Sequence, residues 1–265
     1  FSIMKEVIIK KLLFWLALIV GTVALIGSCA KKDDSTTATA AVATTSGCTV
    51  VSSCSSTATT DNVSGIAGNG YLTGTYDRFV GLSSSIFTVD NTTGCVSDSN
   101  LISAYGSALP TGTASFKYQY VVTSTTTFAG RNAWYSDTSC STPIATFVKG
   151  YTNFATGDNL SGLTVSGEPS TATKYTSTET CMDLYPYNDV GATFINSLIT
   201  GSGITTVSGT RAICGGQGDT EHGIMHISDS SWDSTASDNR TLVVEDGKSS
   251  AWTTWDDPDT LTRID

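Results

Sequence analysis

The sequence predicts a mainly β fold, an antiparallel sandwich or barrel with one short amphipathic helix. After residue 70, runs rich in Tyr, Phe, Val, Ile and Thr recur about ten times between clusters of Gly, Asn, Asp and Ser. Such short, regularly spaced runs are typical of antiparallel strands. The chain has 265 residues, and its hydrophobic content of 39% is sufficient for a sizeable core.

Alternation within the runs indicates half-buried strands. Phe116, Tyr118, Tyr120 and Val122 fall on one face of residues 115–122, with Lys117 and Gln119 on the other. Phe128 and Trp134 share a face of the next run.

The helix is predicted at residues 189–200, with Asp189 as its cap. Five apolar side chains recur there at helical spacing. They are Val190, Phe194, Ile195, Leu198 and Ile199. This stripe predicts a helix that covers a barrel mouth or packs on an outer face.

The N-terminus predicts export. Lys5, Lys10 and Lys11 precede an uncharged run of 19 residues, 12–30, which is also close to the length of a membrane-spanning anchor. Residues 26–29, IGSC, resemble the lipobox of bacterial lipoproteins, and similar relaxed versions occur in spirochaetal lipoproteins. The resemblance favours cleavage before Cys29 and its lipidation over a spanning anchor.

Four regions follow from these patterns. We expect a lipoprotein signal peptide at 1–28, a Ser/Thr-rich flexible tether at 29–66, a β domain at 67–250 and an acidic C-terminal tail at 251–265. The predicted location is the outer membrane or surface of a bacterial cell, where a lipid on Cys29 would anchor the protein.

The charge of the chain argues against nucleic acid as a partner. It carries 14 Lys and Arg against 24 Asp and Glu; cleavage after residue 28 removes three lysines and one glutamate, which leaves 11 against 23. An acidic chain with scattered cations lacks the basic patch that such binding needs.

The cysteines predict disulfides. If Cys29 is acylated, six of the seven cysteines remain, an even number in an exported chain. Of the fifteen pairings possible, we favour Cys48 with Cys54, Cys95 with Cys140, and Cys181 with Cys214.

The order of motifs resembles two known groups. The segments LTGTY at 72–76 and YSDTSCSTP at 135–143, Gly150-Tyr151, the later helix and Cys214 are similar to bacterial lipoproteins with a lipocalin-like domain. They are also similar to the domain of the adenomatosis polyposis coli down-regulated Wnt inhibitors. The resemblance implies a lipocalin-like antiparallel barrel, closed or incomplete, whose apolar concave side takes a lipid in relatives.

Five aromatic residues are the candidates for the lining of a barrel interior, where core filling is the alternative role. They are Tyr118, Tyr120, Phe128, Trp134 and Tyr151.

The motifs indicate neither a cofactor nor a catalytic site. His222 and His226 are weak metal candidates, with Glu221 or Asp229 nearby, because EHxxxH differs from the HExxH of zinc proteases. The glycine-rich residues 215–219 lack a phosphate-binding spacing, and no GxSxG is present. Trp252 and Trp255 stand among carboxylates without EF-hand spacing.

The leading functional hypothesis is therefore an envelope-anchored, non-catalytic protein whose barrel binds an apolar ligand such as a lipid. The alternative is a surface interaction or adhesion protein, with a filled barrel as scaffold and a host or surface protein as partner. A third possibility, a hydrolase, would show a histidine or carboxylate with a shifted pKa in a cleft.

Overall fold

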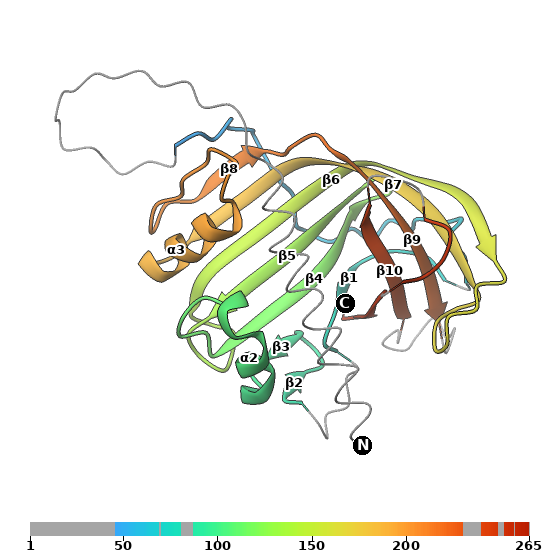
Figure 1. Cartoon of the computed structure of the whole chain (residues 1–265), viewed down its shortest axis with the longest axis horizontal. Coiled ribbons are helices and arrows are strands. Elements are labelled where there is room, and N and C mark those ends of the chain that lie inside the picture. The colour runs from blue at the N-terminus through green and yellow to red at the C-terminus, as the bar shows by residue number, and fades with distance from the viewer. Residues whose placement is uncertain are drawn as a thin grey trace.

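Eight antiparallel strands build the molecule. The computed structural model describes residues 46–68, 70–80, 87–229, 240–248, 252–256 and 258–264, and the whole chain is drawn in Figure 1. The eight strands are β1 (Thr75–Asp77), β4 (Ser115–Ser124), β5 (Thr127–Tyr135), β6 (Pro143–Ser161), β7 (Thr171–Pro186), β9 (Thr220–Asp229), β10 (Arg240–Lys248) and β11 (Asp259–Arg263).

The strands close into a barrel. Their order is β1-β11-β10-β9-β7-β6-β5-β4, and β4 returns to β1, where Tyr76 lies opposite Tyr120 on one side and Arg263 on the other. Two short strands, β2 (Val89–Asp90) and β3 (Cys95–Val96), extend the sheet from β4, and β8 (Ala212–Gly215) pairs with β7. The structure confirms the mainly β, lipocalin-like barrel architecture, and the barrel is closed.

Two apolar clusters occupy the two ends of the barrel. The first contains Phe116, Trp134, Phe147, Met182 and Leu184, from the starts of β4 and β6 and the ends of β5 and β7. The second cluster lies toward the opposite strand ends and includes Tyr120, Val122, Phe128, Tyr175, Met225 and Leu242. The predicted alternation along β4 holds, since all four of its expected apolar side chains belong to these clusters.

Helix α3 (Asp189–Leu198) covers the first cluster and confirms the predicted helix. Its cap is Asn188, whose side chain accepts a hydrogen bond from the Gly191 N–H at 2.9 Å. The expected cap, Asp189, instead lies in the first turn, where its charge favours the helix dipole. Ile195 is fully buried, whereas Val190 is 40% exposed.

A second helix, α2 (Ser99–Tyr105), escaped the sequence analysis and is followed by the 3-10 turn η1 (Gly106–Ala108). Asp98 caps α2 by accepting from the N–H groups of Asn100 and Leu101 at 2.9 and 3.0 Å. The helix has seven residues, too few to show an apolar period. Among the described residues, no helix has the length and apolar character of a membrane span.

Three disulfides stabilise the barrel, and two of the predicted pairings are wrong. Cys95 bonds to Cys140, as predicted. Cys48 bonds to Cys214 and Cys54 to Cys181, in place of the predicted bonds Cys48–Cys54 and Cys181–Cys214. The prediction paired cysteines that follow one another in the sequence, but the chain before the barrel lies against β8 and is bonded to β7 through Cys54, which brings distant cysteines together.

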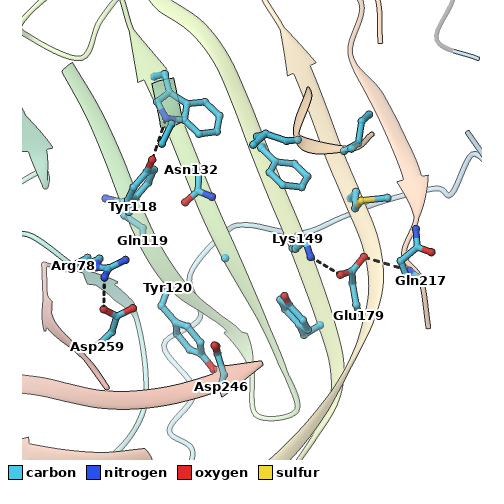
Figure 2. A pocket seen from close by; sticks show the side chains of 18 of the residues that line it. Arg78, Tyr118, Gln119, Tyr120, Asn132, Lys149, Glu179, Gln217, Asp246 and Asp259 are labelled. Atoms are coloured by element: carbon cyan, nitrogen blue, oxygen red, sulfur yellow. Dashed lines mark hydrogen bonds and ion pairs between the residues drawn. The ribbon is translucent and has the colours of Figure 1, made fainter. Parts of the chain in front are cut away.

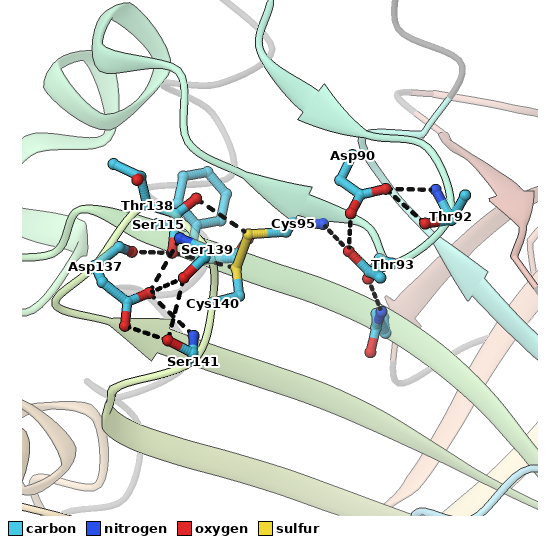
Figure 3. Close-up of a disulfide and its surroundings, with 12 residues drawn as sticks. Asp90, Thr92, Thr93, Cys95, Ser115, Asp137, Thr138, Ser139, Cys140 and Ser141 are labelled. Carbon is cyan, nitrogen blue, oxygen red and sulfur yellow. Dashed lines mark hydrogen bonds between the residues drawn. A yellow bond between two sulfur atoms is a disulfide. The ribbon is translucent and has the colours of Figure 1, made fainter.

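The loop around Cys140 shows why the YSDTSC segment has its composition (Figure 3). The Asp137 carboxylate accepts hydrogen bonds from the Ser139 and Ser141 N–H groups at 3.1 and 3.0 Å and from the Ser141 hydroxyl at 2.6 Å. These bonds hold the pKa of Asp137 well below its usual range. The turn holds Cys140 at a φ of 54° within reach of Cys95.

The predicted tether packs on the barrel from residue 46 onward. Cys48 and Cys54 are bonded to barrel strands, and Val63 and Ile66 are buried in the second cluster. Gly150 permits the close approach, because a Cβ there would lie 2.4 Å from Cys181 Sγ and 2.9 Å from Cys54 Sγ. The flexible tether is thus corrected for residues 46–66; the signal peptide and Cys29 lie outside the described residues.

The predicted acidic tail is also corrected, since it belongs to the barrel. Strand β11 pairs with β1 and β10, and Leu261 is buried in the second cluster. Trp252 and Trp255 are buried against Ile224 and Val243. Their indole N–H groups donate to the carbonyls of His222 and Pro169 at 2.9 and 2.8 Å. Burial of the two indole rings stabilises this segment on the barrel, although acidic residues surround them in the sequence.

Candidate functional site

The barrel contains a cavity of about 380 Å³ between its two apolar clusters. Its wall is formed by side chains from β4, β5, β6, β7, β10, β11 and α3, and it has two halves of different chemistry. The volume is within the range of small-molecule sites.

The apolar half lies at the α3 end of the barrel. Its wall includes Trp134, Phe147, Met182, Phe194, Leu198 and Ile199. The Trp134 ring meets the Phe194 ring edge to face, with 4.9 Å between ring centroids, and its N–H donates to the Tyr118 hydroxyl at 3.4 Å. Burial raises the pKa of Tyr118 well above its usual value, so this phenol stays neutral. This half can hold an apolar group.

The charged half contains two ion pairs (Figure 2). Arg78 is paired with Asp259 at 2.7 Å, and Lys149 with Glu179 at 2.8 Å. The Gln217 N–H also donates to Glu179, at 3.3 Å. Asn132 lies on the same cavity wall.

Two further carboxylates have no ion pair with a described residue. Asp246 lines the cavity, and Glu221 faces the interior because it alternates with Gly223 and Met225 along β9. Burial, followed by the charge of Asp259, raises the pKa of Asp246 to about 6. Burial, followed by the charge of Asp246, raises the pKa of Glu221 to about 7. Both would release their protons more readily if a cation lay beside them.

Unpaired hydroxyl groups lie in the same region. In the part of the chain that the structure describes, the buried hydroxyls of Tyr120, Tyr175 and Ser177 have no hydrogen-bond partner. The Tyr120 phenol points toward Asp246 in Figure 2. Burial raises the pKa of Tyr120 and of Tyr175 well above the usual value, so both phenols are neutral at physiological pH.

Four of the five predicted lining residues, Tyr118, Tyr120, Trp134 and Tyr151, lie on the cavity wall. The fifth, Phe128, lies behind the wall, stacked between Tyr120 and Tyr151 at centroid distances of 4.6 and 4.7 Å. Contact of these residues with a ligand stays a prediction. The charged residues of the cavity wall were not predicted from the sequence.

The two histidines share the outer face of β9, opposite to Glu221. They are four residues apart, which separates them by about 13 Å along a strand, too far for one metal ion. The His226 Nδ1 lies 2.9 Å from the Thr171 carbonyl, and burial lowers the pKa of His226. Among the described residues, no three His, Cys, Asp or Glu side chains are grouped to hold a metal ion.

Fold and cavity together define a closed, eight-stranded antiparallel barrel with an internal site, the architecture expected of a lipocalin-like protein. Comparison with protein-family models and with curated proteins finds no match for this chain.

Proposed function

We propose that this protein is an exported lipoprotein, attached to the bacterial envelope through Cys29, that binds a small ligand with an apolar body inside its barrel. The internal cavity is the observation that carries the proposal. Three disulfides and an export-type N-terminus support a location outside the reducing cytoplasm.

The proposed apolar ligand would lie against the wall under α3. Trp134 and Phe147 offer aromatic surface there, and Met182 offers an adaptable side chain. The rival hypothesis of a filled scaffold for adhesion needs a packed interior, and the cavity argues against it.

A bound ligand is the direct test of this function. The full chain should be purified from its own envelope without added lipid and examined by native mass spectrometry. We expect a mass increment that disappears on denaturation and is extracted by organic solvent. An empty protein that also fails to take up any apolar compound would contradict the proposal.

The anchor has its own test. Cys29→Ser should abolish labelling with radioactive palmitate and leave the precursor uncut, because the thiol is the acylated group. Cys54→Ser, in a cysteine that is disulfide-bonded, serves as the control and should keep its label. Normal maturation of Cys29→Ser would disprove the anchor.

A hydrolase is the second candidate, because Glu221 and Asp246 are interior carboxylates with raised pKa values. Paired carboxylates of unlike pKa perform acid–base catalysis in glycosidases. Nitrophenyl glycosides would reveal this activity, which Glu221→Gln and Asp246→Asn should each abolish. No turnover by the native protein would leave binding as the function.

A further inference from the structure

The charges in the barrel do not balance. Among the described residues, four carboxylates, Glu179, Glu221, Asp246 and Asp259, face three cations, Arg78, Lys149 and Arg263. Arg263 belongs to this set because it shares the inward face of β11 with Leu261. Arg78 is paired with Asp259 and Lys149 with Glu179, whereas neither Asp246 nor Glu221 forms an ion pair with a described residue.

Unsatisfied hydroxyls give a second, independent observation. Tyr120 is 6% exposed and Tyr175 is 2% exposed, and neither hydroxyl has a hydrogen-bond partner among the described residues. A buried polar group without a partner costs free energy that a ligand donating to it would recover. Tyr120 lines the cavity and its phenol points toward Asp246, so its oxygen is available to a donor placed there (Figure 2).

We propose that Asp246, assisted by Glu221 and the Tyr120 hydroxyl, binds the ammonium group of an amphiphilic amine. This proposal rests on the proposed function, because the apolar body of the amine lies in the same cavity, against Trp134 and Phe147. An ammonium group donates three hydrogen bonds and accepts none, which suits two carboxylates and a phenol oxygen.

An organic cation fits this site better than a metal ion does. In the described residues, the carboxylates are not grouped in a set of three that could hold a metal. The cavity is also far larger than an ion, and apolar side chains make up the half beside α3. A ligand with one charged end and one apolar end uses both halves.

The test compares ligands that share an apolar body. Octylamine, octan-1-ol and octanoate are titrated by calorimetry into the full chain at pH 8, where alkylamines are protonated and both carboxylates are ionised. We expect octylamine to bind at least about tenfold more tightly than octan-1-ol, the size of a charge-assisted hydrogen bond. Octanoate should bind most weakly.

Substitutions test whether the carboxylates in the barrel are responsible for the affinity for octylamine. Asp246→Asn and Glu221→Gln preserve shape and remove the charge, and each should reduce the affinity for octylamine while leaving that for octan-1-ol unchanged. Tyr120→Phe should reduce the affinity for octylamine by a smaller factor. Asp158→Asn, an exposed carboxylate on β6, is the matched control and should change neither affinity.

The outcomes separate the two proposals. Equal binding of octylamine and octan-1-ol, or full octylamine affinity in Asp246→Asn/Glu221→Gln, would overturn the ammonium site and leave an apolar site standing. Failure of all three ligands to bind would overturn both.

Discussion

The two halves of the cavity are built in different ways. The apolar half is a continuation of the core, made of side chains such as Trp134 that stabilise the barrel and line the site at once. The charged half contains Asp246, and Glu221 also faces the barrel interior; burial of both carboxylates costs free energy, and neither forms an ion pair with a described residue. The alternation of apolar residues along the strands thus explains the apolar half. The carboxylates of the charged half are not explained by fold stability, because their burial opposes folding.

The largest effect is expected where α3 closes the apolar half. Ile195→Ala removes a fully buried side chain and should lower the free energy of unfolding by about 3 kcal/mol. Val190→Ala on the same helix, at a site that is 40% exposed, should cost less than about 0.5 kcal/mol. Urea denaturation measures both, and equal losses would mean that α3 is not docked as described.

A smaller loss is expected from an ion pair of the charged half. Lys149→Met leaves the Glu179 carboxylate, which is 5% exposed, without its cation, and should destabilise by about 2 kcal/mol. The value is below that of a fully buried pair because the Lys149 side chain is 40% exposed. Lys149→Met/Glu179→Gln should recover most of the loss, while Lys174→Met, on the outer face of β7, should change little. A double variant no more stable than Lys149→Met would contradict this.

The smallest effect depends on pH. Folding raises the pKa of Glu221 from 4.5 to about 7, so the folded state holds the carboxyl proton more tightly than the unfolded state does. The protonated Glu221 therefore contributes its full stabilisation below pH 4.5, and this stabilisation is lost as the pH rises through 7. Glu221→Gln has no carboxyl group to ionise, so above pH 7.5 it should be more stable than the native protein by about 1 to 2 kcal/mol. This difference is smaller than the full value of the pKa shift because solvent in the cavity screens the charge.

Urea denaturation at pH 4.5 and pH 8 measures the difference, with Asp158→Asn as a control that should follow the native protein. A stability difference between Glu221→Gln and the native protein that is the same at both pH values would show that Glu221 titrates normally.

The features predicted from the sequence are local ones. Period-two alternation identified the inward face of β4, and helical period identified α3, because each signal lies within about ten residues. Barrel closure was predicted as one of two options, and the pairing of β1 with both β4 and β11 decides it.

The charged half could not be predicted, and Glu179 shows why. Cys181 points out of the barrel to Cys54, so strict alternation would also turn Glu179 outward. A register shift in the pairing of β6 with β7 sets Gly150 opposite Cys181 but Tyr151 opposite Glu179, so Glu179 keeps the inward phase of Tyr175 while Cys181 turns outward. The bulge depends on strand pairing, so no pattern in the sequence reports it.

Long-range packing explains the other errors. Residues 46–66 look like a spacer because they have no apolar period, yet Cys48 and Cys54 fix them to the barrel. Residues 252–263 look like an acidic tail, yet Trp255 is buried and β11 completes the ring of strands.

If the barrel interior is the proposed binding site, a large side chain added at Gly130 should block it. Gly130 lines the cavity, and a Cβ added there meets no atom within 4 Å. Fluorescence titration of the neutral dye Nile red should show saturable binding to the native chain and to Gly157→Phe, on the exposed part of β6, and none to Gly130→Phe. Binding that is unchanged in a folded Gly130→Phe variant, or absent from the native chain, would show that the barrel interior is not a binding site.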